Sequence, residues 1–139
     1  MPSRLNPYLT FNGNAREAMD FYRTVLGGEV TTSTYGEGGM EHDPSEADKV
    51  MHAQLEAPNG MTLMAGDSPA GAPWSPPAGM SISLSGDDEA ELSGYFEKLT
   101  DGGTIVEPLT KAPWGDQFGM VTDRFGILWM VNIAGNPQG

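Results

Sequence analysis

The chain has 139 residues with 19 acidic and 7 basic side chains, a formal net charge of −12, and no cysteine. This length predicts a single domain, residues 1–139, and the lack of cysteine excludes disulfides, iron–sulfur clusters and thiolate metal sites. The excess of negative charge disfavours binding to nucleic acid. The sequence contains no run of about 18 apolar residues, so it predicts no membrane-spanning helix. No apolar stretch follows Arg4 to suggest a secretion signal, so we expect a cytoplasmic protein that contacts neither nucleic acid nor membrane.

The first part of the chain predicts a strand, a helix and three further strands. After a strand at residues 8–11, Asn14 and Glu17 have the spacing of a helix N-cap and its capping box. Apolar residues then recur along one helix face, and Gly27-Gly28 is expected to end the helix in a left-handed cap. The strands that follow are predicted at residues 30–35, 51–55 and 61–64. Asn59-Gly60 indicates a hairpin turn between the last two, and residues 36–48 are expected to form a glycine-rich acidic loop.

The second part repeats this order after a linker rich in proline and glycine. We place module one at residues 4–66, the linker at 67–79 and module two at 80–135. Asp88, with Glu91 three residues later, predicts the start of the second helix, and Gly102-Gly103 predicts its end. The strands of this part are predicted at residues 81–84, 104–106, 117–121 and 127–133.

The two parts can be aligned residue by residue, which identifies an internal repeat. The last hairpins correspond at an offset of 66 residues, and the first strands correspond at about 73, with Leu9 matching Ile82. The matches at the offset of 66 are Gly60 to Gly126, Leu63 to Trp129, Met64 to Met130 and His52 to Phe118. A repeat of this kind is one supersecondary unit used twice, and it predicts a site between the copies.

Motifs at both ends of the chain resemble those of the PhnB-like branch of the vicinal oxygen chelate superfamily, which includes glyoxalase I, extradiol dioxygenases and bleomycin-resistance proteins. The opening motifs are Pro7-Tyr8-Leu9-Thr10-Phe11, Glu17-Ala18, Phe21-Tyr22 and Gly27-Gly28-Glu29. The closing motifs are Trp114-Gly115-Asp116, Asp123-Arg124-Phe125-Gly126 and Trp129. The resemblance covers nearly the whole chain and implies an α+β fold, in which two βαβββ modules form a cup-shaped, curved mixed sheet. It also implies a homodimer, and it is specific for the fold rather than for a reaction.

In metal-dependent members of this superfamily, His, Glu or Gln on the first and last strand of each module bind a divalent ion. The resemblance places these positions at Pro7, Met64, Ser81 and Met130. Proline has no donor side chain, and methionine sulfur is too soft for magnesium, manganese or zinc chemistry. We therefore expect no cofactor and no divalent metal at these positions.

His52 is one of two histidines and lies between Met51 and Ala53 in a predicted apolar strand. It is a candidate general base or polar anchor, and the alternative is a packed histidine with one structural hydrogen bond. Gln54 lies two residues further on and so shares its face of the strand. His42, in the acidic loop with Glu41 and Asp43, is more simply a solvated loop residue than a metal ligand.

The other candidates are polar or aromatic residues near strand ends and in loops. Asp67 faces the mouth of the cup or caps a turn before Ser68. Trp74 and Trp114 lie in loops where they line a pocket or an interface, and Trp129 is expected in the core. The residues that we assign to ligand binding are Tyr8, Gln54, Asp67, Trp74, Trp114 and Phe118.

Three functions remain open from the sequence. The first is binding of a small molecule in the cup without a metal, which the aromatic and methionine-rich composition favours. The second is a lyase, isomerase or dioxygenase that uses a displaced metal site or acid–base chemistry at His52. The third is a dimeric interaction module with no small ligand.

Overall fold

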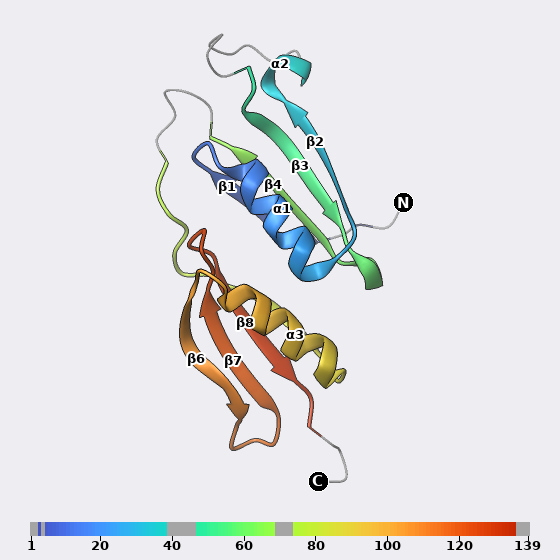
Figure 1. Cartoon of the computed structure of the whole chain (residues 1–139), viewed down its shortest axis with the longest axis vertical. Coiled ribbons are helices and arrows are strands. Elements are labelled where there is room, and N and C mark those ends of the chain that lie inside the picture. Colours follow the sequence, from blue (N-terminus) through green and yellow to red (C-terminus); the bar gives the residue numbers. More distant parts are fainter. Residues whose placement is uncertain (1–2, 4, 39–46, 69–73, 136–139) are drawn as a thin grey trace. The chain divides into compact units, whose positions relative to one another are not determined.

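The computed structural model describes residues 3, 5–38, 47–68 and 74–135, and it places one four-stranded sheet and one long helix in each half of the chain (Figure 1). The chain divides into unit 1, Met1–Ser75, and unit 2, Pro76–Gly139. The division lies inside the predicted linker, residues 67–79. None of the helices described is long and apolar enough to cross a membrane.

Unit 1 has the predicted order of strand, helix and three strands, with two short helical segments added. Its elements are β1 (Tyr8–Phe11), α1 (Ala15–Leu26), β2 (Glu29–Thr34), α2 (Tyr35–Gly38), β3 (Val50–Glu56), η2 (Pro58–Gly60) and β4 (Thr62–Asp67). The sheet order is β1-β4-β3-β2, in which β1 and β4 are parallel and the other pairs are antiparallel. The first strand therefore lies beside the last, and β1 and β2 form the two edges.

The helix α1 covers one face of this sheet because apolar residues alternate along the strands. Leu9 and Phe11 on β1, and Leu63 and Ala65 on β4, are buried, whereas Tyr8 and Thr10, which alternate with the buried residues of β1, are exposed. The buried residues of α1 follow one helix face, as predicted: Ala15, Ala18, Met19, Tyr22, Val25 and Leu26. We call the opposite face of this sheet, which α1 does not cover, the open face of unit 1.

Unit 2 repeats the arrangement. Its elements are β5 (Ile82–Gly86), α3 (Glu89–Thr100), β6 (Thr104–Lys111), β7 (Gln117–Thr122) and β8 (Leu128–Ile133), in the sheet order β5-β8-β7-β6. The Asp88 side chain accepts a hydrogen bond from the Glu91 amide at 3.0 Å, which confirms the predicted cap of α3. The α3 residues Leu92, Phe96 and Leu99 are buried, and the sheet face that α3 does not cover is the open face of unit 2.

The strand registers confirm the repeat and correct one of its offsets. Gln54 pairs with Met64, and Met120 pairs with Met130, so the last hairpins correspond at the predicted 66 residues. Leu9 pairs with Ala65 and Leu84 with Val131, so the first strands correspond at 75 residues rather than 73. The predicted offset was two residues too short. A shift of two residues keeps the same side chains buried and exposed, so the sequence pattern does not distinguish the two alignments.

Four local predictions in unit 1 differ from the structure. The C-cap residue of α1, Gly27, has φ of +80° and ψ of −179°, rather than the predicted left-handed helical conformation. Asn14 occupies the N-cap position of α1, but its side chain makes no capping hydrogen bond. Asn59-Gly60 belongs to the short 3-10 helix η2 rather than to a two-residue hairpin turn. Residues 35–38 form the short helix α2, where a loop was predicted from residue 36 onward.

Asp67 caps α1 in place of Asn14. Its Oδ1 accepts hydrogen bonds from the amides of Gly13 at 3.0 Å and Ala15 at 2.9 Å, and its Oδ2 accepts one from Val50 at 2.9 Å. The Tyr35 hydroxyl donates to the Asp67 carbonyl oxygen at 2.8 Å. Asp67 is only 5% exposed, so one buried carboxylate joins the end of β4 to the starts of α1 and β3.

Unit 2 contains a second buried carboxylate, Asp123, at the turn between β7 and β8. It is 3% exposed. Its Oδ1 accepts hydrogen bonds from the amides of Phe125 at 2.8 Å and Ile127 at 3.1 Å, and its Oδ2 accepts one from the Trp129 indole at 2.8 Å. Trp129 is 1% exposed, which confirms its predicted place in the core and shows how its indole nitrogen is satisfied there.

Candidate functional site

A row of four side chains crosses the open face of unit 1, one from each strand. Tyr8 on β1 pairs with Met64 on β4, Met64 pairs with Gln54 on β3, and Gln54 pairs with Thr31 on β2. Directly paired residues of neighbouring strands point to the same face of a sheet. The sheet thus brings together two predicted site residues, Tyr8 and Gln54, that are 46 positions apart in the sequence.

Tyr8 and His52 form a stacked aromatic pair on this face. Their ring centroids lie 5.8 Å apart with an angle of 29° between the ring planes. The Tyr8 hydroxyl donates to the Met51 carbonyl oxygen at 3.4 Å, across β4. A Cβ on Gly66, which lies between them on β4, would be 2.8 Å from the Tyr8 hydroxyl. The absence of a side chain at position 66 therefore leaves room for the tyrosine to reach β3.

The tyrosine of this pair is neutral at ordinary pH. Although Tyr8 is 49% exposed, partial desolvation of its phenol, and then the neighbouring charge of Tyr35, raise its pKa above the ordinary tyrosine value. A neutral phenol keeps its proton and can donate a hydrogen bond. The pair offers a flat aromatic surface with a hydroxyl at one end.

Polar side chains continue along β3 beyond His52. The His52 Nε2 lies 3.5 Å from the Gln54 Oε1, and the Gln54 amide donates to a Glu56 carboxylate oxygen. The Thr62 hydroxyl donates to the other Glu56 oxygen at 3.1 Å. Glu56 also pairs across the strands with Glu29. The open face of unit 1 therefore changes from aromatic at His52 to acidic at Glu56.

The residues at the family's metal positions do not suit a hard divalent ion. The register places Tyr8, rather than Pro7, beside Met64, and Ser83 pairs with Met130, whose sulfur also contacts the Ser81 hydroxyl at 3.0 Å. Thioether sulfur and neutral hydroxyls are weak ligands for magnesium, manganese or zinc. Within the described ranges, no group of three or more His, Cys, Asp or Glu residues is arranged to hold a metal.

The other predicted site residues of unit 1 lie elsewhere. Asp67 is buried in its capping role, which is neither the cup mouth nor the turn before Ser68 that the sequence suggested. Trp74 is 38% exposed, and its indole donates to the Thr10 carbonyl oxygen at 2.9 Å. Because β1 is an edge strand, Trp74 satisfies a carbonyl group that has no neighbouring strand. His42, Glu41 and Asp43 lie outside the described residues.

The open face of unit 2 carries methionine and aromatic side chains among polar ones. Met120 pairs with Met130, and Phe118 pairs with Asn132. The rings of Trp114 and Phe118 meet edge to face with their centroids 6.0 Å apart. The structure thus joins two predicted ligand-binding residues, Trp114 and Phe118, although Trp114 remains 64% exposed.

Asp116 lies beside this aromatic pair in a network of hydrogen bonds. The Asn132 amide donates to its Oδ2 at 3.0 Å, and the Gly135 amide donates to its Oδ1 at 2.8 Å. The bond from Asn132, followed by the bond from Gly135, lowers the pKa of the Asp116 carboxyl. A lowered pKa means that this network stabilises the fold above the ordinary Asp pKa and loses that effect as the pH falls through the folded value.

Replacing Asn132 with alanine is expected to raise the pKa of Asp116 toward its ordinary value, because the hydrogen bond that lowers this pKa most is removed. Carboxyl carbon chemical shifts measured by NMR during a pH titration would report this change. Asp101 provides an internal reference in the same spectra, since it pairs with Arg124 and not with Asn132. An unchanged Asp116 titration in the variant would contradict the assigned network.

Sequence reasoning missed several residues of the open face of unit 1. Thr31, Ser33 and Glu56 lie on it because they pair with, or follow in alternation, the residues that were predicted. The alternation that linked His52 to Gln54 extends to Glu56 and could have identified it. Thr31 and Ser33 required the pairing register between β2 and β3, which the sequence does not display.

Comparisons with known proteins agree with this architecture. A family model described as the Glyoxalase/Bleomycin resistance protein/Dioxygenase superfamily matches residues 4–131. Protein YjdN of Escherichia coli strain K12 is 30% identical over 142 residues, covering 94% of this chain and 95% of that protein. These two similarities extend over nearly the whole chain, so they concern both units.

Two solved structures are similar over nearly their full lengths. Protein PA1353 from Pseudomonas aeruginosa is 39% identical with a TM-score of 0.84, covering 97% of this chain and 100% of that one. A structure named putative 3-demethylubiquinone-9 3-methyltransferase, PhnB protein, from Bacillus cereus is 29% identical with a TM-score of 0.75, covering 95% and 100%. The fold and the PhnB-like resemblance of the sequence are thereby confirmed.

Proposed function

Since the chain belongs to the glyoxalase/bleomycin resistance protein/dioxygenase superfamily, we propose that it binds a small aromatic molecule on the open face of unit 1, without a divalent metal. The observation that carries this proposal is the stacked pair of Tyr8 and His52. The two stacked rings, inclined to one another by 29°, present aromatic surface, and a planar ligand can extend such a stack. Met64 lies beside Tyr8 and supplies an adaptable apolar contact.

The charge on this face favours a ligand that is also cationic. Glu56 and Glu29 form a pair of carboxylates across β3 and β2, two residues along these strands from Gln54 and Thr31 of the row, and the chain as a whole carries a net charge of −12. A cation gains from nearby carboxylates and from the face of an aromatic ring. A planar aromatic cation would therefore place its rings on Tyr8 and His52 and its charge toward Glu56.

A fluorescence titration with proflavine, a planar aromatic cation, tests the proposal. We expect saturable binding to the purified protein and a loss of about tenfold in affinity for Tyr8→Ala, because the stacked surface is removed. Tyr8→Phe is the matched control, since it keeps the ring and removes only the hydroxyl. Equal binding by wild type and Tyr8→Ala would refute the site, and failure of the wild type to bind would refute the ligand class.

The metal-free part of the proposal has its own test. Thermal unfolding in the presence of zinc, nickel or manganese at stoichiometric concentrations should show the same midpoint as in the presence of a chelator. A rise in the midpoint with any of these ions would overturn it, because a ligand that binds the folded state stabilises it.

A homodimer, which the family resemblance implies, is part of the same proposal. With a chain mass of 14.8 kDa, light scattering on the purified protein should give twice this mass. A mass equal to that of one chain would remove the dimer from the proposal.

The geometry around His52 favours a second function, that of a lyase, isomerase or dioxygenase. In the tautomer that carries its proton on Nε2, His52 directs that proton toward the Gln54 Oε1 at 3.5 Å. Its Nδ1 could then accept a proton from a substrate stacked on Tyr8. Glyoxalase and extradiol dioxygenase assays on wild type and His52→Ala distinguish the two functions, since binding alone predicts no turnover in either protein.

A further inference from the structure

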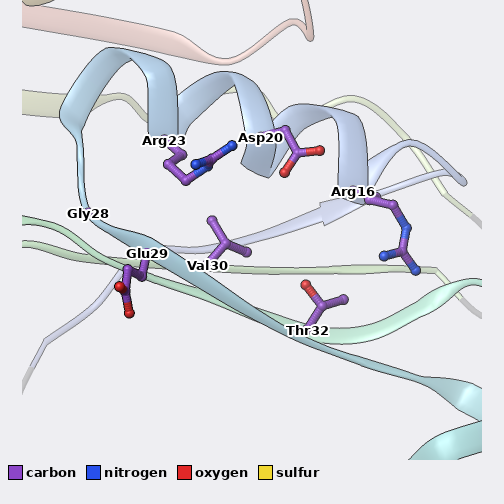
Figure 2. A pocket seen from close by; sticks show the side chains of 7 residues that line it. All are labelled: Arg16, Asp20, Arg23, Gly28, Glu29, Val30 and Thr32. Carbon is purple, nitrogen blue, oxygen red and sulfur yellow. The ribbon is translucent and has the colours of Figure 1, made fainter.

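A cavity lies on the other side of the unit 1 sheet from the open face, between α1 and the edge strand β2. It has a volume of about 380 Å³ and is lined by Arg16, Asp20, Arg23, Gly28, Glu29, Val30 and Thr32. Figure 2 shows Val30 and Thr32 pointing from β2 toward the helix. This volume lies within the usual range for small-molecule sites, about 300–1,000 Å³. The cavity is separate from the open face, because α1 covers the face on which it lies.

Three charged side chains of α1 line this cavity in the order positive, negative, positive. Arg16, Asp20 and Arg23 are spaced i, i+4 and i+7, so they lie on one face of the helix. The two arginines are about 10 Å apart along the helix axis at the usual rise per residue. Two of the seven basic residues of an acidic chain therefore lie at one cavity.

The three charged α1 residues that line the cavity sum to a charge of +1, and Glu29, which also lines it, brings the formal charge of the lining to zero. Glu29 points away from the helix in Figure 2, as its pairing with Glu56 on the open face requires. In the described parts of the chain, the structure gives Asp20 and Arg23 no ion pair. Besides Asp20, Arg16 has an acidic neighbour on α2, Glu37, whose pKa is lowered mainly by hydrogen bonds with Thr34 and to a smaller extent by the charge of Arg16.

We propose that this cavity binds a small amino dicarboxylate. Each guanidinium group would hold one carboxylate of the ligand, and Asp20 between them would accept hydrogen bonds from its ammonium group. Arginine suits this role because its planar donors match a carboxylate. The Thr32 hydroxyl adds a neutral hydrogen-bonding group on the β2 side.

NMR titration of the isotopically labelled full chain with L-glutamate tests the proposal. We expect saturable amide shifts at Asp20, Arg23 and Thr32, and binding about tenfold weaker to Arg23→Gln, because one charge-assisted pair is lost. Lys98→Gln is the matched control: it removes the same charge from an exposed site on α3 and should leave the affinity unchanged.

Two related compounds test the order of charges. Glutarate lacks the ammonium group and L-glutamine lacks the distal carboxylate, so both should bind more weakly than L-glutamate. Equal binding of glutarate would overturn the role of Asp20. No saturable shift with L-glutamate, or equal binding by Arg23→Gln, would overturn the site, and neither result bears on proflavine binding to the open face.

Discussion

Replacing Asp67 with alanine is expected to lower the free energy of unfolding of unit 1 by about 3–5 kcal/mol, because three backbone amides lose their acceptor. The carboxylate is buried, so water can replace these bonds only if the structure opens. The first residues of α1 and β3 would both lose the side chain that accepts their backbone hydrogen bonds. Denaturant unfolding followed by circular dichroism measures this change.

Asn14→Ala is the matched control, because the sequence pattern assigns the cap to Asn14 and the structure assigns it to Asp67. Its side chain makes no capping bond, so the variant should lose less than about 0.5 kcal/mol. If Asn14→Ala destabilised the protein as much as Asp67→Ala, the assignment of the cap to Asp67 would be wrong.

The second large effect is expected for Gly28→Ala, at the point where the chain leaves α1 and enters β2. A Cβ at this position would lie 2.0 Å from the Glu56 carbonyl oxygen and 2.8 Å from the Ala57 Cα, and the residue has φ of +97°. Both contacts are to backbone, so no side chain can move aside. We expect a loss of about 3 kcal/mol or more in the free energy of unfolding.

Gly27→Ala separates the steric clash from the backbone strain. Gly27 also has a positive φ, +80°, but the nearest atom to its Cβ would be the Pro58 Cδ at 3.7 Å, an ordinary contact. This variant should lose about 1–3 kcal/mol, the cost of the unusual conformation alone, and so less than Gly28→Ala. Equal losses for the two variants, measured by the same unfolding assay, would show that the close approach of Gly28 to β3 is not what limits substitution.

The order of elements could be predicted from the sequence because it depends on local signals. The spacing of apolar residues on α1, the cap of α3 at Asp88 and the glycines after each helix are all encoded within a few residues of where they act. The motifs at both ends of the chain then gave the family. The cap of α1 could not be predicted, since it comes from Asp67, 52 positions after the amide of Ala15.

The candidate site was predictable only in part for the same reason. Alternation on one strand linked His52 to Gln54, but the stacking of Tyr8 on His52 depends on the register of β1, β4 and β3. The register also decides that Tyr8, rather than Pro7, lies beside Met64. The cavity of Arg16, Asp20 and Arg23 has a local signal, their helical spacing, but its other wall is β2, and only the fold places that strand there.

The two buried carboxylates do not occupy equivalent places in the two copies. At the offset of 66 residues, the counterpart of Asp67 is Ile133 and the counterpart of Asp123 is Ala57. The two units therefore share a topology, but each is stabilised by a buried carboxylate at a different position of the repeat. The mutational tolerance of a position in one half is consequently no guide to that of its counterpart in the other.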